Sequence, residues 1–143
     1  MLDATVAANL RLAAENLFRA RSVLAAYVFG SRVTGTPLPD SDLDVGYYLE
    51  GYRRGERFSI GDEMRLASGL SDAVGLDVDL RSLAAAPLEL RGRVLEEGVR
   101  IYSGDAVARV ALERDLLARY HDYKDVFRQM HSVRLRAVAE RGL

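Results

Sequence analysis

The chain has 143 residues, of which 49% are hydrophobic and 29% charged, so it is long enough for one globular domain with its own core. It has no cysteine, which excludes disulfides and cysteine-ligated zinc or iron–sulfur sites. A net charge of −1 argues against nucleic-acid binding through bulk electrostatics. Neither a membrane-spanning apolar run nor a signal peptide is recognisable, so we expect a cytoplasmic protein that contacts no membrane and no nucleic acid directly.

The first half of the chain predicts a helix and two buried strands. Residues 4–20 place apolar side chains at three- and four-residue spacing, which is typical of a helix that packs on one side. The short apolar runs 23–29 and 43–49 are typical of strands buried on both faces. Between them, Gly30 and Ser31 begin a loop whose remainder, Arg32 to Ser41, is rich in turn-forming residues.

The second half predicts three further helices and two further strands. A helix interrupted by glycines covers about 56–70. A strand follows at 76–83, a helix runs from Pro87 to Gly98, and a short strand covers 99–102. The last helix runs from Asp105 to about Glu140, which is long enough that a break within it is expected. The side of the 56–70 helix expected to be buried consists of Phe58, Ile60, Met64 and Leu70.

This order predicts an α/β (α+β) fold with a small mixed sheet of three to four strands, helices packed against it and a long C-terminal helix. We expect a single domain over residues 1–143, with a core at about 20–103 and the C-terminal helix at about 105–140.

Acidic residues at the start of the second strand suggest a metal site. Asp42 and Asp44 are two positions apart and therefore point to the same face of a strand. Their oxygens suit Mg²⁺, which is commonly completed by substrate phosphates. Strand alternation also places Asp77 and Asp79 on one face, and either could supply a third carboxylate. Crowded carboxylates repel one another unless cations neutralise them, so such a cluster favours a metal.

The turn before the acids suggests a phosphate site. Gly30 and Ser31 could offer backbone N–H groups and a hydroxyl to phosphates, and Arg32 adds positive charge beside them. Each of these features alone is most often structural: a turn, or the solvated side of a strand. Their combination at this spacing favours a nucleotide-and-metal site.

The segment Gly30-Ser31, ten residues, then Asp42-Leu43-Asp44 resembles the G-S-x10-D-x-D signature of the DNA polymerase beta-like nucleotidyltransferases. The flanks GSRVTG and SDLDV, and VDLRSL at 78–83, resemble the minimal nucleotidyltransferase (MNT) branch. The resemblance implies the nucleotidyltransferase fold, with Asp42, Asp44 and Asp79 as catalytic metal ligands for two Mg²⁺ ions. It also implies that Gly30, Ser31 and Arg32 bind ATP, the co-substrate. Asp79 is preferred to Asp77 because its distance from Ala86-Pro87 fits the family pattern.

Small MNT proteins are commonly the antitoxins of HEPN/MNT toxin–antitoxin pairs, in which AMP is transferred from ATP to a tyrosine of the HEPN ribonuclease. The resemblance therefore implies an AMPylating enzyme with a HEPN-type toxin as partner. Two alternatives stay open: a small-molecule, antibiotic-type nucleotidyltransferase, and a binding-only antitoxin that occludes its partner.

The C-terminal helix offers one check on this interpretation. The segment His121-Asp122-Tyr123 matches part of the HEPN motif R-x4-H-x-Y, but Leu116 stands where the motif needs arginine. The chain therefore resembles the antitoxin and not the ribonuclease. Tyr120, Tyr123 and Phe127 could pack on the domain or form a homo- or hetero-oligomer through this helix.

Overall fold

The computed structural model describes residues 2–35 and 42–140, except for the side chains at positions 131–132 and 134–140. In chain order the elements are α1 (Ala4–Phe18), β1 (Val23–Phe29), α2 (Ser31–Thr34), β2 (Leu43–Leu49), the 3₁₀ turn η1 (Tyr52–Arg54), α3 (Ile60–Val74), β3 (Val78–Ser82), α4 (Leu88–Glu97), β4 (Val99–Ser103) and α5 (Ala106–Glu140). The predicted fold class is confirmed. Positions 36–41, which are most of the predicted loop, lie outside the described residues.

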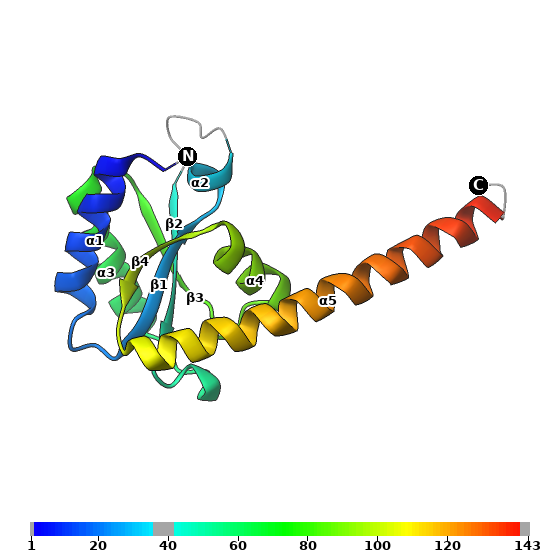
Figure 1. Ribbon diagram of the computed structural model, residues 1–143. Coiled ribbons are helices and arrows are strands. Elements are labelled where there is room, and N and C mark those ends of the chain that lie inside the picture. The colour runs from blue at the N-terminus through cyan, green and yellow to red at the C-terminus, as the bar shows by residue number, and fades with distance from the viewer. Residues whose placement is uncertain (1, 36–41, 141–143) are drawn as a thin grey trace.

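The four strands form one mixed sheet in the order β3-β2-β1-β4 (Figure 1). β1 pairs antiparallel with both β2 and β4, whereas β2 and β3 are parallel. The register sets Asp44 opposite Phe29 on one side and opposite Asp79 on the other. Residues from three distant parts of the chain are thereby brought to the same end of the sheet.

Helices cover both faces of this sheet. α1 and α3 pack together on one face, and α4 and α5 lie on the other (Figure 1). Alternation along β2 serves both layers: Val45 and Tyr47 join the core under α1 and α3, while Tyr48 joins the core under α4 and α5. Asp44, whose position alternates with Val45, therefore lies on the α4 side of the sheet.

Of the four residues predicted on the buried side of the 56–70 helix, Phe58 and Leu70 are buried, whereas the other two are not. Ile60 and Met64 are 72% and 68% exposed, while Glu63 is only 8% exposed. The helix begins at Ile60 because the Ser59 hydroxyl caps it by accepting a hydrogen bond from the Asp62 N–H at 3.1 Å. Phe58 therefore precedes the helix, and Glu63, Leu66 and Leu70 form the buried stripe of α3.

Glu63 is tolerated in the core because it is fully paired. The Tyr47 hydroxyl donates to Glu63 Oε2 at 2.6 Å and accepts from the Phe58 N–H at 2.9 Å. Arg57 donates to the other carboxylate oxygen at 2.8 Å. Buried carboxylates persist only with such partners.

The expected break in the C-terminal helix does not occur, because α5 is continuous from Ala106 to Glu140. Its first half packs on the domain through Leu112, Leu116 and Tyr120, which are all buried. Its second half projects away from the body, and there Phe127 is 55% exposed (Figure 1). None of the helices described is long and apolar enough to cross a membrane.

Candidate functional site

The end of β1 approaches β2 so closely that only glycine fits there. Gly30 has φ 88° and ψ −161°, a conformation open essentially to glycine alone. A Cβ added at this position would lie 2.5 Å from Asp44 Oδ2. Gly30 therefore allows the turn after β1 to lie directly against the Asp44 carboxylate.

The turn continues into the single helical turn α2, which the sequence had predicted as loop. The Gly30 carbonyl accepts hydrogen bonds from the Val33 and Thr34 N–H groups at 3.0 and 3.2 Å, and from the Thr34 hydroxyl at 3.3 Å. Ser31 is exposed at the start of α2, and Arg32 beside it is half-buried. Both residues thus follow directly the glycine that contacts Asp44.

The acids lie on the same face of neighbouring strands. Asp44 and Asp79 are register partners on β2 and β3. Asp42 is exposed just before β2, and strand alternation directs it to the same side as Asp44. Asp77 precedes β3, where its carbonyl accepts a hydrogen bond from the Leu43 N–H at 2.8 Å. The register favours Asp79 over Asp77 as the partner of Asp44.

The carboxylates are close enough to influence one another. Partial burial raises the pKa of Asp44, the guanidinium of Arg81 opposes that rise, and the charges of Asp79 and Asp42 add to it. Arg81 lies two residues after Asp79 on the same strand face, and its Nη2 donates to Asp79 Oδ2 at 2.7 Å. Arg81 is thus the cation that balances these acids in the structure.

The carboxylate oxygens of Asp42, Asp44 and Asp79 are the kind of ligand that Mg²⁺ prefers, so the donor set fits this ion. Among the described residues, no three acidic, histidine or cysteine side chains are gathered tightly enough to hold a metal as they stand. Of these acids, Asp79 is paired with Arg81 at 2.7 Å in the structure. The three-acid metal site stays a prediction.

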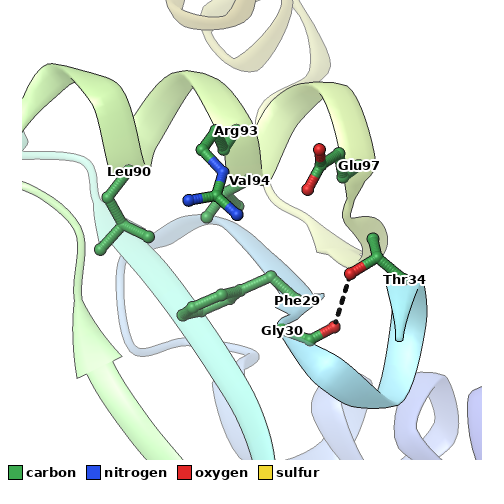
Figure 2. A pocket seen from close by; sticks show the side chains of 7 residues that line it. All are labelled: Phe29, Gly30, Thr34, Leu90, Arg93, Val94 and Glu97. Carbon is green, nitrogen blue, oxygen red and sulfur yellow. Dashed lines mark hydrogen bonds between the residues drawn. The ribbon is translucent and has the colours of Figure 1, made fainter. Parts of the chain in front are cut away.

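A pocket of about 180 Å³ opens on the other side of Gly30 (Figure 2). Its lining comes from the end of β1, from α2 and from α4, namely Phe29, Gly30, Thr34, Leu90, Arg93, Val94 and Glu97. Figure 2 shows the Arg93 guanidinium directed from α4 toward Phe29 and Gly30, with the Glu97 carboxylate nearer Thr34.

Sequence reasoning missed both arginines of this region as site residues. Arg81 could have been found, because residues two positions apart on a strand point to the same face, which places Arg81 beside Asp79. Arg93 could not be found, because nothing local shows that α4 lies over the end of β1. That contact depends on the crossover from β3 through α4 to β4.

Comparison with protein families gives one match: the polymerase beta nucleotidyltransferase model covers residues 13–106. Comparison with curated proteins gives no significant match. The family match spans every element from β1 to β4, and therefore includes the Gly30 turn and all the acids discussed above.

Solved structures share the fold at low sequence identity. A toxin–antitoxin complex with AMP-PNP matches with a TM-score of 0.61 and 19% identity, over 90% of this chain and 97% of that chain. The MntA–HepT toxin–antitoxin matches at 0.58 and 16%, over 90% and 96%. A complex of tri-AMPylated HEPN toxin with MNT antitoxin from Shewanella oneidensis matches at 0.60 and 16%, over 92% and 98%.

Because the family model covers well over half of the chain and includes the Gly30 turn and the acids, this protein belongs to the polymerase beta nucleotidyltransferase family.

Proposed function

We propose that this protein is a Mg²⁺-dependent antitoxin that transfers AMP from ATP to a tyrosine hydroxyl of a HEPN-type ribonuclease toxin. The observation that carries the proposal is the contact of Gly30 with Asp44, together with the register that sets Asp79 beside Asp44. A phosphate-binding turn and metal-binding acids must adjoin in this way for a metal-bound nucleotide to bridge them. The similar fold of a complex that contains an AMPylated HEPN toxin supports the choice of acceptor.

In this proposal each residue has a separate task. Asp42, Asp44 and Asp79 hold Mg²⁺, which when bound neutralises the phosphates and lowers the pKa of the acceptor hydroxyl. The Gly30 backbone and the Ser31 hydroxyl bind the phosphates, and Arg32 adds positive charge. Arg81 keeps Asp79 oriented on the strand face before substrate binds.

The reaction forms a bond between the tyrosine oxygen and the α-phosphorus of ATP and breaks the bond from that phosphorus to pyrophosphate. Pyrophosphate leaves with the electron pair of the broken bond. In this proposal the hydroxyl proton passes to the Asp79 carboxylate, which lies on the side of Asp44 away from Gly30. Positioning and charge neutralisation supply most of the rate, as in other phosphoryl transfers.

Labelled ATP tests the proposal. The protein, Mg²⁺ and the product of the adjacent gene are incubated with ATP labelled at the α-phosphate, and in parallel at the γ-phosphate. We expect α-label but no γ-label on the partner. Asp44→Asn should abolish the transfer while the far-ultraviolet circular dichroism stays unchanged.

Other outcomes identify the alternatives. Label on a small hydroxylated acceptor, with none on the partner, would indicate an antibiotic-type enzyme. A tight complex without label would indicate an antitoxin that acts by occlusion. Full transfer by Asp44→Asn would refute the assigned site.

A further inference from the structure

We propose that Arg93 of α4 binds the β- and γ-phosphates of the nucleotide, and so holds the pyrophosphate that leaves. This inference rests on the proposed function. It adds to the proposed ATP site a residue from outside the signature segment. It also gives the direction in which the triphosphate of ATP lies across the sheet.

The direction follows from the order of the elements. Across the α4 side of the sheet, Asp79 on β3 is followed by Asp44 on β2, then by Gly30 at the end of β1. α4 packs on β1, so the pocket that contains Arg93 is the next feature beyond Gly30. A triphosphate with its α-phosphate at the acids and its next phosphate at the Gly30 turn therefore ends in this pocket.

The size and charge of the pocket fit that end of the molecule. Its volume of about 180 Å³ is below the roughly 300–1,000 Å³ of pockets that enclose a drug-sized ligand, which suits phosphate groups better than a whole nucleoside. Phe29, Leu90 and Val94 form apolar walls, and the charged residues that line the pocket are Arg93 and Glu97. Arg93 is the cation among the residues that line the pocket.

Arg93 is available for a ligand. The ion pairs found in the described part of the chain do not include it, and its side chain is exposed toward the pocket (Figure 2). A guanidinium fork can donate two hydrogen bonds to a phosphate. Glu97, one turn later on α4, is the opposing charge in the pocket, so it should weaken phosphate binding.

Equilibrium binding to the full-length protein in Mg²⁺ tests the assignment. Two probes are used: an ATP analogue with a methylene group between the α- and β-phosphorus atoms, and AMP. Arg93→Gln should weaken binding of the ATP analogue about tenfold, as expected for the loss of one charged phosphate contact, and should leave AMP affinity unchanged. Glu97→Gln should tighten binding of the ATP analogue.

Arg114→Gln is the matched control, because it removes the same charge from an exposed position on α5 outside this pocket. It should change neither affinity. Equal losses for the ATP analogue and AMP in Arg93→Gln would place Arg93 at the nucleoside or the α-phosphate, which the two probes share, and would overturn the inference. No loss for either probe would overturn it as well. If the wild type itself fails to bind the ATP analogue, the proposed function fails with it.

Discussion

Replacement of Gly30 by alanine tests the contact on which the candidate site depends. The residue adopts φ 88° and ψ −161°, and a Cβ would lie 2.5 Å from Asp44 Oδ2. Gly30→Ala therefore imposes two costs at once. The backbone must hold a conformation that L-residues rarely adopt, and the Asp44 carboxylate must leave its position.

The size of the effect can be worked from these two costs. A non-glycine residue in this backbone region costs about 1–3 kcal/mol. Forcing the Asp44 side chain off its rotamer adds about 0.5–1.5 kcal/mol. We therefore expect Gly30→Ala to lower the free energy of unfolding by about 3 kcal/mol, which corresponds to a fall in Tm of roughly 10 °C for a chain of this length.

Gly55→Ala is the matched control, measured by urea unfolding beside Gly30→Ala. Gly55 has φ 76°, and a Cβ there would meet nothing within 4 Å, so it carries backbone strain without a clash. We expect it to cost about 1 kcal/mol and to leave Mg²⁺-nucleotide binding intact, whereas Gly30→Ala abolishes binding. If Gly30→Ala is as stable as Gly55→Ala and still binds nucleotide, the close contact with Asp44 is not what shapes the site.

Three further predictions concern the scaffold. Tyr47→Phe removes the hydroxyl that donates to buried Glu63, so urea unfolding should show a free energy of unfolding lower by about 1–3 kcal/mol, with nucleotide affinity unchanged. A loss of nucleotide affinity would show that the two sheet faces are coupled. Gly92→Ala places a Cβ 2.1 Å from the Tyr120 ring, so it should cost about 1–3 kcal/mol and speed hydrogen exchange in α5, and wild-type exchange there would contradict this packing. Burial, and the hydrogen bond to Glu63, raise the pKa of Tyr47. The unfolded chain therefore loses the Tyr47 hydroxyl proton near pH 10, while the folded protein keeps it. In a pH series of thermal melts, this contribution to stability should be full below about pH 10 and fall above it. Tyr47→Phe should reduce that fall.

The sheet and the strand faces could be predicted because they depend on local patterns. The apolar runs 23–29 and 43–49 coincide with β1 and β2, and period-2 alternation placed Asp79 on a face away from Leu80. The signature spacing also predicted that the Gly30 turn and Asp44 belong to one site, and the two lie in close contact. These features need only short-range periodicity and one tight turn.

Features that depend on the phase of a helix or on tertiary contacts could not be predicted from local sequence patterns. Apolar periodicity assigned Ile60 and Met64 to the core, but the buried stripe of α3 includes Glu63, whose hydrogen bond with Tyr47 is a tertiary contact. The continuity of α5 could not be predicted either, because its second half projects away from the body of the domain. The position of Arg93 over the end of β1 likewise depends on how α4 packs against the sheet.

The most direct test of AMP transfer to a HEPN-type toxin is to locate the modification on that partner. The product of the adjacent gene is incubated with Mg²⁺-ATP and the wild-type protein, and is then analysed by intact-mass and tandem mass spectrometry. We predict adenylyl groups attached to tyrosine, a matching loss of ribonuclease activity, and neither change with Asp44→Asn. If the partner loses its ribonuclease activity while its mass stays unchanged, the proposed AMP transfer is refuted.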